Sequence, residues 1–266
     1  MINRVWVVGS GIWAGKIESS LLTYSKFRVT KVGAREFEAI YKNIKSNDLV
    51  WIASRPEVQI SILQNFLEPY PGYIILEKPY GLSKRDLTYV KSLIGAKDRV
   101  FLSTPWLYSS LWRSAMELIS SNKIIQLHGK RVGPVMRSYC SSVEDRLPHD
   151  LYMLQYLKDN SSLEPSKLSF INSTKAELGF LETDNEVVKI EIGHSETLVA
   201  FWKITISTGH IIVNFDTHHI FAKGRLLSHH STRDKPLTQM LERILSGKRL
   251  LHNQVGLIDT MLELSV

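Results

Sequence analysis

The sequence predicts a two-domain protein, in which an α/β domain on a parallel sheet is followed by an α+β domain with an open, mostly antiparallel sheet. Within residues 1–105, short apolar runs alternate with helical segments, as they do in a doubly wound parallel sheet. Within residues 106–266, strand-like runs follow one another and are separated by turn residues, as they are in antiparallel sheets. We therefore place the domain boundary between residues 105 and 106.

Composition agrees with a globular protein of this size. The chain has 266 residues, of which 44% are hydrophobic and 22% charged. The single cysteine, Cys140, excludes an internal disulfide framework and fits a reducing compartment. No apolar run is as long as a membrane span, and the run before Gly9 is too short for a signal peptide. We expect a cytoplasmic protein that does not bind a membrane.

The first apolar run, residues 4–8, leads directly into the turn Gly9-Ser10-Gly11-Ile12-Trp13-Ala14, which fits the pattern G-x-G-x-x-G/A. Gly9 permits the tight turn, Gly11 lets a pyrophosphate approach the backbone, and the small Ala14 lets the next helix pack closely. That helix, about residues 12–23, points its positive dipole end at the phosphates. The pattern predicts a Rossmann dinucleotide-binding domain. The expected cofactor contacts in this turn are Gly9, Ser10, Gly11, Ile12 and Trp13.

The end of the second strand, about residues 27–32, bears on the choice of cofactor. An acid at this place usually binds the ribose 2′-hydroxyl of NAD(H). Here the strand ends at Gly33-Ala34-Arg35, and an arginine suits the 2′-phosphate of NADP(H). We therefore expect contacts from Ala34 and Arg35 and a preference for NADP(H). NAD(H) remains the alternative, because Glu36 follows and a plain surface arginine would explain the same residue.

The third apolar run, residues 48–54, ends at Ser54-Arg55-Pro56. Ser54 is expected to cap the following helix, which begins with Pro56 in its first turn and extends to about residue 67. Ligands of parallel sheets bind outside the carboxyl ends of the strands. Ser54 and Arg55 are therefore expected to contact the cofactor as well.

The fourth strand, residues 74–76, stops at Glu77-Lys78-Pro79. Pro79 disfavours a helical conformation for Lys78, so that a cation with a carboxylate beside it is held at the strand end. Glu77 and Lys78 are therefore expected to contact the cofactor too. The alternative is an ordinary strand terminus with two solvated charges. A helix over about residues 83–94, capped by Ser83, and a strand over residues 100–103 complete the first domain.

The second domain opens with a helix over about residues 107–120 and a strand over residues 124–138 with an interruption at Gly133-Pro134. Leucines at helical spacing then predict a helix around residues 144–157. Asp145 and His149 are four residues apart and share a face if this helix covers both. The remaining predicted elements are strands at 167–172, 175–181, 187–192, 198–207 and 211–215 and helices at 236–246 and 251–264.

With these motifs in order, the chain resembles the glucose-fructose oxidoreductase, inositol dehydrogenase and rhizopine-catabolism family (Gfo/Idh/MocA) over nearly its whole length. The glycine turn, Glu77-Lys78-Pro79 and Asp145-x-x-x-His149 carry the resemblance. The resemblance implies that Lys78, Asp145 and His149 lie by the nicotinamide and the reacting carbon. The chain departs from the family in having Tyr152 where an aspartate is frequent, and Asp150 beside the histidine instead.

The chemistry implied is hydride transfer between a nicotinamide and a carbonyl or alcohol carbon, which also needs a proton at the oxygen. His149 exchanges this proton most readily near neutral pH, while Lys78 polarises the oxygen; the reverse assignment stays open. Trp106 and Tyr108 are expected to line the substrate cleft together with Lys78, Asp145 and His149. In isolation, His149 would be a structural histidine.

The function that follows is NADPH-dependent reduction of a keto-sugar or sugar-nucleotide carbonyl. A net charge of +7 without any basic run suits small anionic ligands better than nucleic acid, which we do not expect as a partner. The alternatives are a reductase of a cyclic imine or tetrapyrrole and a non-catalytic protein that senses the dinucleotide.

Two further expectations concern metals and assembly. The histidines at 218–219 and 229–230 are adjacent pairs, whose members point to opposite faces of a strand, and no cysteine cluster joins them; we expect no metal site. The open sheet leaves an apolar face, expected at Ile211, Val213 and Phe215, which a homodimer or higher homo-oligomer would cover.

Overall fold

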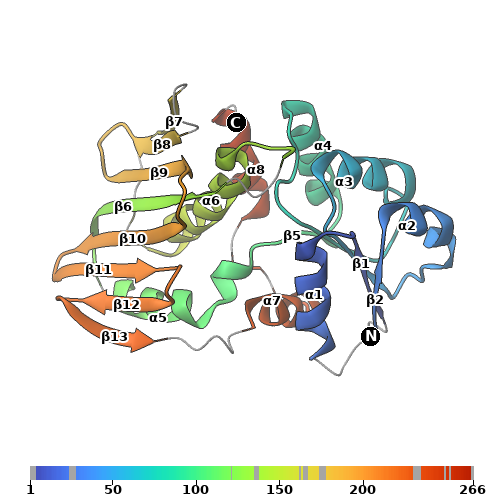
Figure 1. The fold of residues 1–266 in the computed structure, drawn as a ribbon, viewed down its shortest axis with the longest axis horizontal. Coiled ribbons are helices and arrows are strands. Elements are labelled where there is room, and N and C mark those ends of the chain that lie inside the picture. The colour runs from blue at the N-terminus through green and yellow to red at the C-terminus, as the bar shows by residue number, and fades with distance from the viewer. Residues whose placement is uncertain are drawn as a thin grey trace. The chain divides into compact units, whose positions relative to one another are not determined.

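A computed structural model describes residues 4–23, 28–120, 122–134, 138–161, 163, 167–173, 178–229, 235–248, 250–251 and 253–264. The chain forms two compact units, drawn in Figure 1. The first unit comprises residues 1–104, 237–250 and 254–266, and the second comprises residues 105–236 and 251–253. His230 and residues 174–177, where a histidine pair and the start of a strand were expected, lie outside the described residues.

The first unit is built on a five-stranded parallel sheet with the order β2-β1-β3-β4-β5. The central strands form because their residues are almost all apolar and are buried on both faces; all four residues of β3 are buried. The strands are β1 (Arg4–Val8), β2 (Arg28–Val32), β3 (Leu49–Ile52), β4 (Tyr73–Leu76) and β5 (Val100–Leu102). The predicted parallel sheet is confirmed.

Helices connect these strands and cover the sheet. Ser83 caps α4 as predicted, because its hydroxyl accepts a hydrogen bond from Asp86 N at 3.1 Å. The helices of the first unit are α1 (Ile12–Leu22), α2 (Ala34–Ile40), α3 (Pro56–Ile62, continued by a π-turn over Leu63–Leu67), α4 (Lys84–Ala96), α7 (Pro236–Leu245) and α8 (Gln254–Glu263).

The two C-terminal helices belong to the first unit, which corrects the expected second domain of residues 106–266. The α8 helix packs on α4, where Lys91 and Asp259 form an ion pair at 2.5 Å. The Gln254 side chain accepts a hydrogen bond from the backbone N–H of Leu102, at the end of β5, at 2.6 Å. These long-range contacts leave no mark in the local sequence pattern, so a boundary set by pattern alone misplaces the helices.

The second unit contains an eight-stranded sheet with the order β13-β12-β11-β10-β6-β9-β8-β7. Its strands pair antiparallel except for β6 and β9, which run parallel, so the predicted mostly antiparallel sheet is confirmed. The strands are β6 (Ile124–Gly133), β7 (Leu168–Ser173), β8 (Leu178–Thr183), β9 (Val188–His194), β10 (Val199–Ile206), β11 (Gly209–Asn214), β12 (His219–Ala222) and β13 (Arg225–His229). Because β6 lies between β9 and β10, the sheet is not the simple meander that the run of strands suggested.

Two helices, α5 (Ser110–Ile119) and α6 (Ser142–Asn160), pack against this sheet within the second unit. The side chains of Ile211, Val213 and Phe215 are at most 2% exposed in this chain alone. The expectation that these three residues form an open apolar face is therefore wrong. Alternation along β11 puts Ile211 and Val213 on the buried side, with the partly exposed Ile212 between them, and Phe215 follows the end of the strand.

Candidate functional site

The residues expected to bind a dinucleotide all follow the carboxyl ends of neighbouring strands in the first unit. Strand order reverses between β1 and β3, which is the topological switch point where open α/β sheets bind ligands. The glycine turn follows β1, and residues 34 and 35 follow β2. Ser54 and Arg55 follow β3, and Lys78 follows β4. The parallel register places these segments along one edge of the sheet.

The glycine turn has the shape that a pyrophosphate needs. Gly9 is held between its neighbours, because its N–H donates to Val32 O at 2.8 Å and a Cβ here would collide with the carbonyl of Ala53. Gly11, in contrast, has open space where a Cβ would stand. Helix α1 starts immediately afterwards, and no side chain caps it. Its first backbone N–H groups can therefore donate hydrogen bonds to an anion. These features fit a bound dinucleotide.

At the end of β2, Arg35 and Glu36 are both exposed, but they differ in what they contact. The Glu36 carboxylate accepts a hydrogen bond from the Gly33 N–H at 2.6 Å and thereby caps α2. This acid is therefore engaged at the helix start, while Ala34 and Arg35 stand directly after the strand end.

At the end of β3, Ser54 does not cap the following helix, contrary to the expectation. Its hydroxyl donates to Val8 O at 3.0 Å, and the capping position of α3 is Arg55, with Pro56 in the first turn. Ser54 thus ties the end of β3 to the end of β1.

The strand end that carries Lys78 is held by side chains from two other elements. The Glu77 carboxylate is 3% exposed and accepts a hydrogen bond from Trp51 Nε1, on β3, at 3.0 Å. The Gln59 amide, from α3, donates to the carbonyls of Glu77 and Pro79 at 3.0 and 3.2 Å. These bonds bracket the half-buried Lys78 on both sides. Gln59 was missed in the sequence, and only its helical spacing from Pro56 could have indicated that it faces the sheet.

The buried Tyr80, which follows Pro79, also helps to hold this turn in place. Its hydroxyl donates to Ser103 O at 2.8 Å. Burial, followed by the nearby Glu77 charge, raises the pKa of Tyr80 well above its usual value, so the phenol remains a neutral donor.

In the second unit, α6 carries both Asp145 and His149. The helix begins at Ser142, because Ser141 and Glu144 form a capping box: Glu144 N donates to Ser141 Oγ at 3.1 Å, and Ser141 N donates to the Glu144 carboxylate at 2.7 Å. Pro148 therefore lies inside the helix and not near its start. Asp145 is 7% exposed and His149 is half-buried, one helical turn apart.

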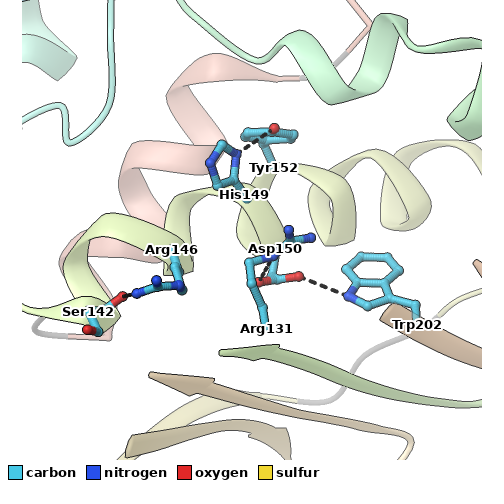
Figure 2. Close-up of polar contacts among 7 residues, drawn as sticks. All are labelled: Arg131, Ser142, Arg146, His149, Asp150, Tyr152 and Trp202. Atoms are coloured by element: carbon cyan, nitrogen blue, oxygen red, sulfur yellow. Dashed lines mark hydrogen bonds and ion pairs between the residues drawn. The ribbon is translucent and has the colours of Figure 1, made fainter. Parts of the chain in front are cut away.

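His149 contacts a residue whose part in the site the sequence did not reveal. Its Nδ1 atom lies 2.9 Å from the hydroxyl of Tyr152, which is fully buried. Figure 2 shows the two side chains together on one side of α6. The spacing of three residues on a helix is the signal that could have linked them.

Asp150, next to His149, points toward the sheet instead (Figure 2). Its carboxylate accepts hydrogen bonds from Arg131 Nε at 2.7 Å and from Trp202 Nε1 at 2.9 Å, and all three side chains are buried. Burial raises the pKa of Asp150, while Arg131 and Trp202 oppose this shift. Because the 2.7 Å contact is an ion pair with a buried guanidinium, we take the pair to be charged. It joins α6 to β6 and β10.

Arg146 anchors the first turns of α6. Its guanidinium donates to the carbonyls of Ser142 and Pro134 at 3.3 and 2.6 Å. Burial lowers the pKa of Arg146, and the adjacent Asp145 partly counters this effect.

The two aromatic residues expected to line a substrate cleft differ in burial. Trp106 is half-buried and stacks on His218, with ring centroids 5.9 Å apart. Tyr108 is 5% exposed, and its hydroxyl accepts the Leu251 N–H at 3.5 Å. A structural role is the simpler assignment for Tyr108, whereas Trp106 remains accessible.

Within the described ranges, no three histidine, cysteine, aspartate or glutamate side chains come together in a way that could hold a metal ion. No helix in the same ranges is long and apolar enough to span a membrane.

The protein therefore has two domains. The first contains a parallel sheet and a glycine turn of the kind found in dinucleotide-binding domains. Neither a protein-family model nor a curated protein sequence matches the chain. Solved structures do, over nearly its whole length, and the neighbours include several oxidoreductases.

UDP-N-acetylglucosamine 3-dehydrogenase GnnA from Acidithiobacillus ferrooxidans matches at 17% identity and a TM-score of 0.74, covering 99% of this chain and 96% of that one. Scyllo-inositol dehydrogenase from Lactobacillus casei, solved with NAD(H) and scyllo-inositol, matches at 13% identity and 0.74, covering 100% and 96%. Biliverdin reductase from Synechocystis sp. PCC 6803, solved with biliverdin and NADP+, matches at 14% identity and 0.69, covering 98% and 96%. The predicted fold class is confirmed, and the resemblance seen in the sequence is consistent with these neighbours at the level of the fold.

Proposed function

We propose that this protein is an NAD(P)-dependent oxidoreductase of the Gfo/Idh/MocA family that reduces the carbonyl of a keto-sugar or sugar nucleotide with NADPH. The observation that carries the proposal is the alignment of the glycine turn, Arg35, Ser54 and Lys78 along the carboxyl edge of one parallel sheet. The oxidoreductase neighbours support it, because two of them, GnnA and scyllo-inositol dehydrogenase, are named for a sugar nucleotide and a polyol.

In this proposal the nicotinamide dinucleotide supplies the hydride. The open backbone at Gly11 and the start of α1 bind its pyrophosphate, and Arg35 binds a 2′-phosphate. Lys78, fixed between the two carbonyls that Gln59 holds, and His149, held by Tyr152, act on the substrate oxygen. Between them they polarise the oxygen and exchange its proton. Asp145 and Trp106 complete the substrate site.

A tetrapyrrole is the second candidate substrate. Biliverdin reductase shares the fold over 98% of this chain, so the same two units can be built around a substrate that is not a carbohydrate. In that case the dinucleotide site and Lys78 would keep their roles, and only the substrate contacts would differ.

A panel assay that follows NADPH absorbance tests the proposal. The panel contains keto-sugar nucleotides, free keto-sugars, cyclic imines and biliverdin, each with NADPH and NADH. We expect turnover with a carbohydrate carbonyl. Turnover confined to biliverdin or an imine would move the substrate to the second class. Binding of reduced dinucleotide without turnover of any compound would instead support a non-catalytic dinucleotide sensor.

A further inference from the structure

A cluster of aromatic side chains in the second unit extends from its core to its surface. The buried ring of Phe215 meets the buried Trp202 and the half-buried Trp106 edge to face, with ring centroids 6.0 and 5.7 Å apart. On its outer side Trp106 stacks on the half-buried His218, with centroids 5.9 Å apart and an interplanar angle of 29°. The cluster thus ends in two partly exposed rings, an indole and an imidazole, which both belong to the second unit.

The loop between β11 and β12 holds His218 in an unusual backbone conformation. Asn214 Oδ1, at the end of β11, accepts hydrogen bonds from the backbone N–H groups of Asp216 and Thr217 at 3.0 and 2.8 Å. The last residue of the loop, His218, has a φ of 57°, in the left-handed region that glycine adopts at a lower cost in free energy than a residue with a side chain. The turn alone therefore does not explain why a histidine stands at this position.

The two rings have complementary surfaces for a sugar. The part of the indole that remains exposed can pack against the C–H groups of a sugar ring, and a neutral imidazole has one donor and one acceptor for a hydroxyl group. The charges near the rings disfavour a phosphate. The exposed Asp216 lies two residues before His218, and the guanidinium of Arg131, 5.1 Å from the Phe215 ring, is already paired with Asp150. An uncharged ring with hydroxyl groups fits these surroundings best.

We propose that Trp106 and His218 bind the sugar ring of the substrate, Trp106 through the C–H groups of the ring and His218 through one of its hydroxyl groups. The proposal rests on the proposed function, which makes the ligand a carbohydrate, whereas the contacts that carry it lie within the second unit alone. His218 is then a specificity-determining residue that takes no part in the transfer of the hydride or the proton. A ligand that lacks the hydroxyl group leaves the imidazole without this hydrogen bond and binds more weakly.

The first test needs no turnover. Saturation-transfer NMR of the full chain with UDP-N-acetylglucosamine, N-acetylglucosamine and UDP, each added alone, shows which part of a sugar nucleotide contacts the protein. We expect transfer to the sugar ring protons of both sugar-containing probes. His218→Gly should weaken the binding of N-acetylglucosamine about two- to tenfold, as the loss of one hydrogen bond does, and Trp106→Leu should weaken it by a similar factor. Transfer confined to the uracil protons, or unchanged binding in His218→Gly, would overturn the proposal.

A second measurement separates sugar binding from a structural role of the stacked rings. His218→Gly removes a side chain from a left-handed position, so the midpoint of thermal unfolding should stay the same or rise. Asparagine tolerates this conformation and keeps a donor and an acceptor, so His218→Asn should recover part of the binding. As a control, His210→Ala truncates an exposed histidine of β11 and should leave sugar binding unchanged. A lower midpoint in His218→Gly together with unchanged binding would make the stack purely structural.

The third test uses the compound that the wild type reduces fastest in the panel. His218→Gly should raise KM about two- to tenfold and keep kcat within about twofold, because the imidazole binds the sugar ring equally in the ground state and the transition state. A fall in kcat at an unchanged KM would overturn the assignment. If no compound is turned over, the proposed function fails, and the NMR titrations still decide whether Trp106 and His218 bind a sugar.

Discussion

Lys78 and His149 are each held in place by a neighbouring side chain that has no proposed part in the reaction. Lys78 lies between two backbone carbonyls that a buried glutamine binds, and His149 lies against a buried tyrosine. The backbone on both sides of Lys78 and the ring of His149 are thus held before any ligand binds, as the proposed roles of these two residues require.

We expect Lys78→Ala and His149→Ala each to lower turnover about 10²–10⁴-fold, because under the proposed function each removes a group that acts on the substrate oxygen. Folding and cofactor affinity should change little, since neither side chain is fully buried. Steady-state kinetics, circular dichroism and cofactor titration measure the three effects. Lys84→Ala and His128→Ala, which truncate exposed side chains, serve as controls. Near-normal turnover in a variant would make that residue structural.

NADP(H) should bind more tightly than NAD(H), because Arg35 is available for a charge-assisted contact while Glu36 caps α2. Such a contact is worth roughly 1.5–3 kcal/mol, or about ten- to a hundredfold in affinity. Fluorescence titration of both cofactors measures the ratio. Arg35→Ala should abolish the preference and leave NAD(H) affinity unchanged. Tighter binding of NAD(H) by the wild type would contradict the prediction.

Replacing one partner of the buried ion pair of Arg131 and Asp150 should lower the free energy of unfolding more than replacing both. Arg131 Nη2 is already buried without a hydrogen-bond partner among the described residues, so removing the carboxylate leaves a buried cation almost uncompensated. We expect Asp150→Leu or Arg131→Met alone to cost about 3–5 kcal/mol, and the double variant to cost less than either. Urea unfolding measures these values. A double variant as unstable as the sum of the single variants would contradict this prediction.

At the scale of elements, the turn between β1 and α1 combines a glycine that packing requires with a glycine that packing does not require. A Cβ at Gly9 would collide with the Ala53 carbonyl, whereas a Cβ at Gly11 would meet no atom within 4 Å. The two positions therefore separate the stability of the turn from its capacity to bind a dinucleotide.

Gly9→Ala should destabilise the protein by about 1–3 kcal/mol, because backbone must move to admit the methyl group. Gly11→Ala should change stability by no more than about 0.5 kcal/mol and yet weaken dinucleotide binding by about tenfold or more, because the methyl group occupies the approach to the backbone. Thermal unfolding without ligand and cofactor titration give the two quantities. Unchanged affinity in Gly11→Ala would place the pyrophosphate elsewhere.

At the scale of the whole molecule, the sheet of the second unit has one face covered by α5 and α6 and a second face that carries apolar side chains. Ile212, Phe221 and Leu226 come from three neighbouring strands and pair across them, and Leu226 is 52% exposed. They lie on the side opposite the buried Val213 and Ile220. This patch replaces the one that was expected from the sequence.

We propose that this patch lies in the interface of a homodimer or higher homo-oligomer, because a second copy would remove it from water. Light scattering at micromolar concentration should give a mass above that of the 30.4 kDa chain. Phe221→Glu should shift the mass toward the monomer, whereas Leu22→Glu, at an exposed apolar residue of α1, should not. A monomer in the wild type would remove the proposal.

Much of the fold could be predicted because it depends on local sequence patterns. Short apolar runs, the glycine turn and the cap at Ser83 each depend on residues within a few positions of one another. The strands of the first unit, the start of α4 and the coverage of Asp145 and His149 by one helix follow from such patterns. The same reasoning placed the candidate cofactor residues at strand ends, and the parallel register then aligned them along one edge.

The other features of the fold depend on packing between residues that are far apart in the sequence. Residues 237–250 and 254–266 belong to the first unit, where Met240 accepts a hydrogen bond from Thr104 N and α8 contacts α4 and the end of β5. Strand β6 lies between β9 and β10 through pairings that span many residues. Gln59 reaches the carbonyls beside Lys78 only because α3 carries it there, whereas Tyr152 meets His149 at the local spacing of three residues on α6. A local pattern states which face of an element is apolar, but not which distant element covers it, since that choice depends on the free energy of the whole packed chain.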